Sequence, residues 1–234
     1  MKFLYKNDIY PGNKGRGRKM SKSSIYTIDS KFNGFVKNEY KNSWWFSPVV
    51  WDVLLDKYMH NDIQTPFGFK KSIIGWDGEE LNKKLNQLMN SCDNFSDRIC
   101  WEITNQQIFF TKDKEQIAKA LKDFAQMNKE FHKDSEGISV LTYEHILERF
   151  NEIADDILAI NEKHYPYFVF KNTSVDDNVE FWFEKYVKEA DEYTSRTLKE
   201  LNEYVTEFVK IKDSKIQGFI SNLDYFNKKH EKFA

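Results

Sequence analysis

The most unusual segment for chemistry is a basic, glycine-rich stretch within residues 11–22. Glycines at positions 12, 15 and 17 alternate there with cations. Backbone amides in such turns and the guanidinium forks of arginine can approach phosphate oxygens closely. The pattern is neither a P-loop, since no Gly-Lys-Ser/Thr follows at the required spacing, nor a dinucleotide-binding Gly-x-Gly-x-x-Gly. It predicts either a mobile, solvated loop or a contact with nucleic acid through four side chains, Lys14, Arg16, Arg18 and Lys19.

A run of aromatic residues near position 45 indicates a recognition surface. Trp44, Trp45 and Trp51 lie around a Ser-Pro pair, and tryptophan rings supply large contact areas at protein interfaces. The alternative is that these rings belong to the core, which we expect for Trp51. The first two of these tryptophans are expected to form the floor of a partner-binding groove together with a third tryptophan and two acids at the start of the next helix. The five residues are Trp44, Trp45, Trp76, Asp77 and Glu80.

No set of residues in the sequence predicts catalysis or metal binding. The five histidines are far apart, whereas a metal site needs three or four convergent ligands. No nucleophile elbow is present, and Cys92 and Cys100 are expected to be reduced thiols, a local disulfide being the alternative. Adjacent carboxylates such as Asp155 and Asp156 point about 100° apart on a helix, so they form no acid–base couple. We therefore expect no catalytic residue, metal or cofactor, although an enzyme whose site gathers distant residues stays open.

The charge of the chain is unevenly distributed. Residues 1–41 hold ten Lys or Arg and three Asp or Glu, a balance of +7, which leaves 25 basic and 34 acidic residues, a balance of −9, for the remainder. Such asymmetry is typical of a basic arm for nucleic acid or of an acidic body for a basic partner, and it also suits a solvated surface.

The hydrophobic periodicity predicts helices separated by short strands. Ser47-Pro48 opens a helix that runs to about Met59, since serine caps helices and proline is favoured at their first position. Further helices are expected after Asp77, near Asp113 and after the cap Thr142. Strands are expected at 24–28, 98–103, 107–111 and 166–170, the middle two as a hairpin, and long helices over 174–209 and 211–226.

These elements predict a predominantly helical α+β protein with a small antiparallel sheet packed with helices, plus a C-terminal segment of long helices. The expected division is a body over residues 1–172 and a helical segment over 173–234, which packs on the body or makes an oligomer. No secretion signal or membrane-spanning run is evident, so we expect a soluble, cytoplasmic protein without membrane contact.

Three segments together carry a resemblance: SWWFSPVVWD at 43–52, GWDGEELNKKL at 75–85 and YPYFVFKNTSVDDNVEFWFEKY at 165–186. The combination resembles a loose group of small bacterial and phage proteins with a tryptophan-pair–Pro–Trp-Asp segment. The aromatic, acidic and helix-rich character is similar to that of bacterial proteins that confer immunity to toxins. The resemblance implies a protein that neutralises a basic toxin or effector by covering it, with no catalytic motif to carry over.

The sequence therefore favours a protein-binding module, an inhibitor or an immunity protein, over an enzyme. Acidic side chains of the body would meet a basic surface of the partner and steer association. The alternatives are a nucleic-acid-associated protein that uses the basic N-terminal loop, an enzyme with a site not visible in the sequence, and an assembly role of the C-terminal segment.

Overall fold

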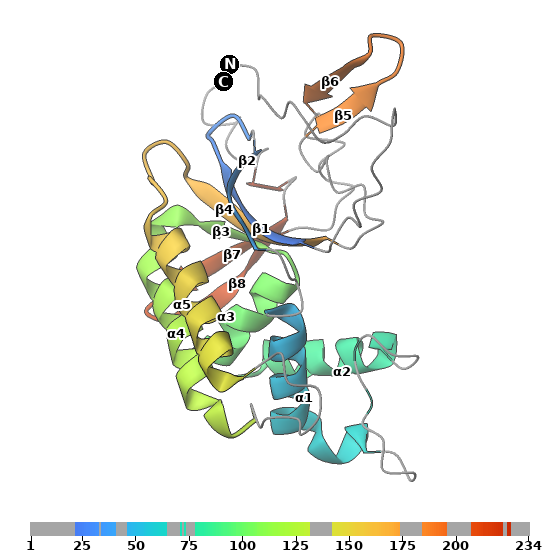
Figure 1. Cartoon of the computed structure of the whole chain (residues 1–234), viewed down its shortest axis with the longest axis vertical. Coiled ribbons are helices and arrows are strands. Elements are labelled where there is room, and N and C mark those ends of the chain that lie inside the picture. The colour runs from blue at the N-terminus through green and yellow to red at the C-terminus, as the bar shows by residue number, and fades with distance from the viewer. Residues whose placement is uncertain are drawn as a thin grey trace.

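A computed structural model describes residues 22–32, 34–40, 46–64, 71, 73, 78–131, 142–173, 184–195, 207–221 and 224–225 (Figure 1). Over these residues the chain forms five α-helices, two short 3₁₀ turns and eight strands. In chain order the elements are β1 Lys22–Ile28, β2 Gly34–Tyr40, α1 Ser47–Ile63, α2 Gly78–Asn90, α3 Phe95–Thr104, β3 Ile108–Phe110, η2 Thr111–Asp113, α4 Lys114–Met127, η3 Lys129–Phe131, α5 Tyr143–Leu158, β4 Tyr167–Thr173, β5 Glu184–Val187, β6 Glu192–Ser195, β7 Glu207–Lys212 and β8 Lys215–Ser221.

Six of the strands form one mixed sheet in the order β2-β1-β4-β3-β7-β8. Every neighbouring pair is antiparallel except β3 and β7, which are parallel and pair Ile108 with Phe208. Strands β5 and β6 form a separate two-stranded hairpin. Helices α3, α4 and α5 lie on one side of the large sheet, and α1 and α2 extend the helical part away from it (Figure 1).

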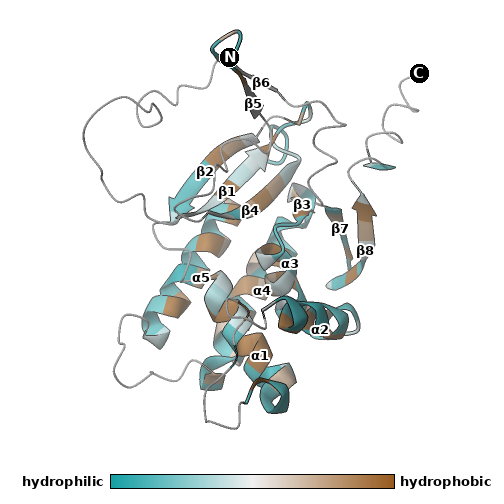
Figure 2. Ribbon diagram, turned by 90° about the vertical axis from the view of Figure 1, so that its right-hand side faces the viewer, coloured by the Kyte–Doolittle hydropathy of each residue, from teal (hydrophilic) through white to brown (hydrophobic). Residues whose placement is uncertain are grey.

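The alternating side chains of β4 divide the core between the two faces of the sheet. Phe168 and Phe170 join the main cluster beneath the helices, where Phe150 of α5 stacks on Phe124 of α4. Tyr167, by contrast, belongs to a smaller aromatic cluster on the opposite face. Hydrophobic and hydrophilic bands alternate along the helices in Figure 2, as expected for helices that bury one face.

Several predicted helices are confirmed, and α5 has the cap predicted for it. The Thr142 side chain accepts a hydrogen bond from the His145 backbone N–H and so caps α5. Helix α1 begins at Ser47 with Pro48 in its first turn, but the expected serine cap is wrong, because Phe46 occupies the N-cap and no side chain bonds there. The helix kinks at Met59, where the predicted helix ends, before continuing to Ile63. Helices α2 and α4 cover the other two regions expected to be helical. The predicted strands at 24–28 and 166–170 correspond to β1 and β4.

The predicted hairpin of residues 98–103 with 107–111 is wrong. Residues 98–103 lie within helix α3, because the Asn94 side chain accepts a hydrogen bond from the Asp97 N–H and starts a helix there. Residues 96–103 of α3 are buried apart from Arg98, so the burial does not follow a simple one-face pattern. Strand β3 does form, but its partners are β4 and β7.

The predicted helices after residue 173 are also wrong over the described residues, apart from Asp224 and Tyr225, which are helical. The described residues before these two form β5 to β8, and β7 and β8 complete the large sheet. Asp213 and Ser214 have φ of 52° and 53° between the last two strands, the conformation of a two-residue hairpin turn with both central residues left-handed. The β-branched and aromatic run before this turn packs as a strand, with Phe208 and Val209 fully buried.

The predicted fold class therefore needs correction. The chain is α+β, but it has a six-stranded mixed sheet in place of a small antiparallel one, and strands where a C-terminal segment of long helices was expected. Within the described residues, no helix is both long enough and apolar enough to cross a membrane.

Candidate functional site: an acidic strip on helix α5

Most of the residues predicted to bind a partner lie outside the described part of the chain. The exception is Glu80, on the first turn of α2. Its side chain is 69% exposed and forms an ion pair with Lys84, one turn later, at 3.0 Å. The hydrogen bond and the charge of Lys84 hold the pKa of Glu80 below its usual value. The residues outside the described ranges are Lys14, Arg16, Arg18, Lys19, Trp44, Trp45, Trp76 and Asp77.

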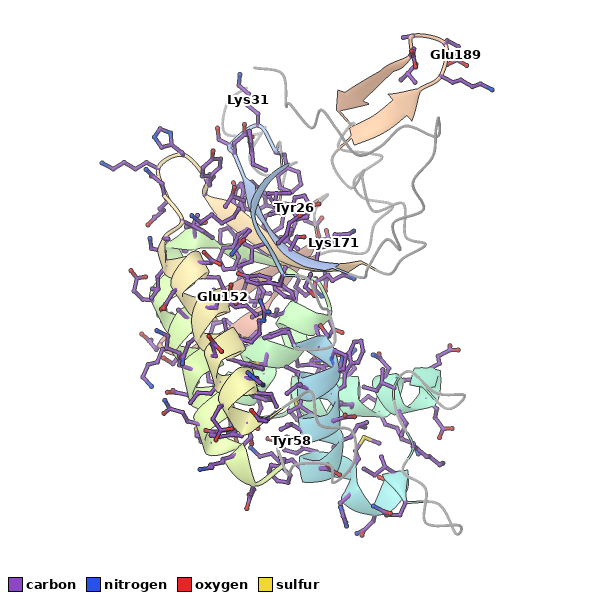
Figure 3. The ribbon with its side chains drawn as sticks, in the orientation of Figure 1. Tyr26, Lys31, Tyr58, Glu152, Lys171 and Glu189 are labelled. Carbon is purple, nitrogen blue, oxygen red and sulfur yellow. The ribbon has the colours of Figure 1, made fainter. Side chains whose placement is uncertain are left out.

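Helix α5 presents a line of carboxylates that the predictions did not single out. At about 100° per residue, four acids fall within about 80° of the helix circumference. Glu144, Glu148 and Asp155 are exposed there, and so is Glu152, which lies on α5 in Figure 3. We call these four residues, Glu144, Glu148, Glu152 and Asp155, the acidic strip.

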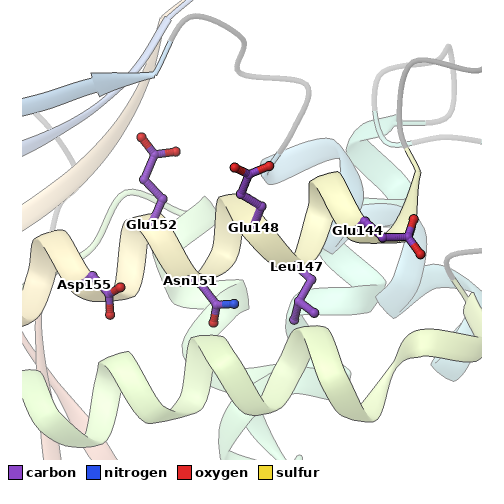
Figure 4. A pocket seen from close by; sticks show the side chains of 6 residues that line it. All are labelled: Glu144, Leu147, Glu148, Asn151, Glu152 and Asp155. Carbon is purple, nitrogen blue, oxygen red and sulfur yellow. The ribbon is translucent and has the colours of Figure 1, made fainter.

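The acidic strip borders a shallow, open depression of about 520 Å³. Leu147 and Asn151, which also line it, point from α5 toward α4 in Figure 4, while Glu148 and Glu152 point away from α4. The depression therefore combines a small apolar and amide floor with a rim of carboxylates. Such a surface suits a partner that brings cations to the rim and a short apolar or polar group to the floor.

The flank of α5 that faces away from α4 is hydrogen-bonded to strand β2, and this attachment determines which way the acidic strip faces. Asp156 Oδ2 accepts hydrogen bonds from the Tyr40 hydroxyl and from Asn38 Nδ2, both at 2.6 Å. Arg149 lies over the Tyr40 ring at 5.0 Å. Burial, followed by the hydrogen bond to Asp156, raises the pKa of Tyr40 well above its usual value, so this phenol stays neutral. With β2 on one flank and α4 on the other, α5 can turn only its remaining face outward.

Two of the four carboxylates of the strip already form ion pairs with described residues. Asp155 forms an ion pair with Lys122 of α4 at 2.7 Å, and Glu152 forms one with Arg149 at 2.8 Å. Glu144 accepts a hydrogen bond from its own backbone N–H and one from Thr142, and these contacts lower its pKa. Glu148 has no ion pair with any described residue. Exposed ion pairs of this kind contribute about 0–1 kcal/mol, so a partner can exchange them at little cost.

The contacts of α5 confirm that its adjacent acids diverge. Asp155 reaches Lys122 on α4, whereas Asp156 reaches the hydroxyl and amide of β2. They form no acid–base couple. The sequence carries a signal for the strip that could have been used, because Glu144, Glu148 and Glu152 recur at four-residue spacing within a confidently predicted helix.

A second polar cluster lies between α1, α3 and the end of α4, and its burial indicates a structural role. Asp97 accepts the Tyr58 hydroxyl at 2.5 Å and the Lys57 ammonium at 2.7 Å, both at Oδ2. Asn128 donates to the other oxygen at 3.2 Å and accepts from Lys57 at 3.0 Å. Burial, followed by the hydrogen bonds to Asp97 and Cys92, raises the pKa of Tyr58, which lies low among the helices in Figure 3.

The two cysteines are free thiols. Cys100 is fully buried on α3, and burial raises its pKa well above the usual value, with the Asp97 charge acting in the same direction. A thiol held neutral in the core is a poor nucleophile. Cys92 is partly exposed and lies 3.3 Å from the Tyr58 hydroxyl.

Comparisons of the chain with protein-family models, with curated proteins and with solved structures find no significant match.

Proposed function

We propose that the protein is a binding module of the inhibitor or immunity type, which holds a basic partner protein through the acidic strip and covers the partner's working surface. The observation that supports it best is the open depression on α5, with four carboxylates around Leu147 and Asn151. The acidic balance of −9 beyond residue 41 points in the same direction.

The mechanism that follows is electrostatic steering and then occlusion. A surface with one sign of charge attracts a partner of opposite sign during diffusion and fixes the register of docking. The two intramolecular ion pairs, to Lys122 and Arg149, would open or be shared as cations of the partner arrive. The fixed position of α5 on the sheet favours this role, since a prearranged surface loses little entropy on binding.

The same geometry argues against nucleic acid as the ligand of this face. Phosphates would be repelled by the acidic strip, because the two cations beside it are already in ion pairs with Glu152 and Asp155. A contact with nucleic acid would need the basic residues near the N-terminus, which the described structure does not include.

The experiment is an affinity capture from cells of the source organism, followed by binding kinetics with the captured protein. Three tagged chains are compared: wild type, a Glu148→Lys/Glu152→Lys variant and a Glu189→Lys control. Glu189 is exposed on the turn between β5 and β6, far from α5 (Figure 3), so its reversal gives the same kind of charge change elsewhere. Circular dichroism first establishes that all three chains fold alike.

The proposal expects one stoichiometric protein that survives nuclease treatment and binds the wild type and the Glu189→Lys control equally. The double variant should associate at least about tenfold more slowly at low salt, and the difference should shrink as salt screens the charges. Equal association of all three chains, or a recovered protein that disappears after nuclease treatment, would refute the proposal.

A further inference from the structure

The junction between α3 and β3 contains buried polar groups without partners. Glu102 is only 2% exposed, and its Oε1 has no hydrogen-bond partner. Gln106, one helical turn later, also buries an unpartnered Oε1, and its φ of 57° is left-handed. Unpaired buried polar atoms and left-handed non-glycine residues both disfavour the native state, so they persist at sites with a further role more often than elsewhere.

This junction is joined directly to the C-terminal hairpin. The backbone N–H of Gln107 donates to the carbonyl oxygen of Glu102 at 3.2 Å. The side-chain oxygen of the same Gln107 accepts the backbone N–H of Glu207 at 2.7 Å. Glu207 is the first residue of β7, which runs parallel to β3, and β8 of the same hairpin contacts α3. A change in the charge of Glu102 is therefore felt at the first residue of β7.

The charges around Glu102 are unevenly matched. Arg98, on the preceding turn of α3, attracts it, and Glu207 repels it, while Asn105 supplies a hydrogen bond. None of the other described elements packed on α3 places a charged group that acts on this carboxyl. Burial is the dominant influence and raises the pKa of Glu102 to about 7, from an ordinary 4.5. The carboxyl is therefore close to half protonated at neutral pH.

We propose that Glu102 is a proton-operated clamp on the β7–β8 hairpin. In the neutral form, the carboxyl is buried without a charge, and no negative charge faces Glu207. In the ionised form, a buried carboxylate without a full set of partners lies near a second carboxylate on β7. The start of β7 can relieve this repulsion by moving away from α3 and letting water in, so the hairpin is held firmly in acid and loosely in base.

The direction of the effect follows from proton binding. The native state holds the Glu102 proton more tightly than the unfolded or opened state does, because its pKa is raised. The stabilisation that this proton supplies is complete below pH 4.5 and is lost as the pH rises through about 7. Between pH 6 and pH 8, therefore, Glu102 should change from mostly protonated to mostly ionised, and its hold on the hairpin should weaken.

The test is hydrogen exchange of the full chain, read by mass spectrometry at pH 6 and pH 8 and corrected for the intrinsic effect of pH on exchange. In the wild type, peptides that cover residues 207–221 should lose about tenfold in protection at pH 8, while those of α4 and α5 keep theirs. In Glu102→Gln, which is neutral at every pH, the protection of the hairpin should not change between the two values.

Two further variants keep the test decisive. Glu207→Gln, which removes the repulsion and leaves Glu102 buried, should lower the pKa of Glu102, and so make the loss of protection smaller and move it to lower pH; it serves if Glu102→Gln does not fold. Glu130→Gln, at an exposed position beyond α4, should behave as the wild type. An equal loss in the wild type and Glu102→Gln, or a loss spread evenly over α4, α5 and the hairpin, would overturn the clamp.

Discussion

The polar cluster of Lys57, Asp97 and Asn128 allows a direct test of what holds the helices α1, α3 and α4 together. Lys57 is the only cation within ion-pair distance of Asp97 among the described residues. Substituting Lys57→Met removes the ammonium and keeps much of the length of the side chain. Asp97 then retains the hydroxyl of Tyr58 and the amide of Asn128, two neutral donors for a full negative charge.

The expected loss can be bracketed from the geometry. Removing one partner of a fully buried ion pair costs about 3–5 kcal/mol, because a charge is left uncompensated. A hydrogen bond to a charged group contributes about 1.5–3 kcal/mol. The Asp97 side chain is 1% exposed but that of Lys57 is 25% exposed, so water can replace part of the lost interaction. We therefore expect Lys57→Met to lower the free energy of unfolding by about 2 kcal/mol, between these limits.

A double-mutant cycle separates this effect from ordinary packing. In an Asp97→Asn background the carboxylate is absent, so Lys57→Met should change the free energy of unfolding by less than about 0.5 kcal/mol. The assay is urea denaturation, followed by the fluorescence of tryptophan and by circular dichroism. If Lys57→Met costs the same in both backgrounds, its effect comes from packing, and the account of Asp97 as a buried charge that needs Lys57 is wrong.

Three other perturbations test separate parts of the structure. Gly78→Ala should lower the free energy of unfolding by about 1–3 kcal/mol in a urea titration, because the added methyl group would overlap the carbonyl oxygen of Ile73. Lys114→Met should lower the free energy of unfolding by about 1–2 kcal/mol in the same assay, since the Lys114 ammonium donates to two carbonyl oxygens at and beyond the end of α5. The control is Lys119→Met, which removes an exposed ion pair on the same helix, α4, and should lower it by less than about 0.5 kcal/mol. Thermal denaturation at several pH values should show that the free energy of unfolding of the wild type falls as the pH rises from 4.5 to 7. The fall due to Glu102 should reach about 3 kcal/mol, because burial raises its pKa to about 7. A Glu102→Gln variant with the same dependence on pH would contradict this.

Local signals predicted several helix starts, because such signals act over only a few residues. Thr142 and the Ser47-Pro48 pair mark helix starts in the sequence, and the described structure has α5 and α1 at those places. Helix α3 was missed because buried residues surround most of its circumference. Its apolar residues therefore follow neither the period of a one-sided helix nor that of a strand clearly. The capping residue Asn94, three positions before Asp97, was the better signal there.

Strand pairing was beyond the reach of the sequence, since it depends on partners far along the chain. The run from Phe208 to Ile211 could be read as an apolar stripe on a helix, and only its pairing with β3 makes it a strand. Its turn contains Asp213 and Ser214 instead of the usual Asn-Gly, which weakened the hairpin signal. The candidate site was predictable only in part for the same reason. The spacing of the acids on α5 can be seen in the sequence, but the direction in which they face depends on a contact with Tyr40 of the distant strand β2.

The order of strands also determines when the sheet can assemble during synthesis. Gln107 and Glu207 are 100 residues apart in the chain, and β3 has its neighbours β4 and β7 only after both have left the ribosome. Contacts of such high sequence separation slow folding, because a long loop must close before they form. A nascent chain that ends before residue 207 would leave the parallel side of β3 unpaired, with the side chains of Ile108 and Phe109 deprived of part of their cover. The helical part can condense early, but a chain that lacks β7 and β8 should aggregate or be degraded, so the survival of the protein after synthesis depends on these two strands.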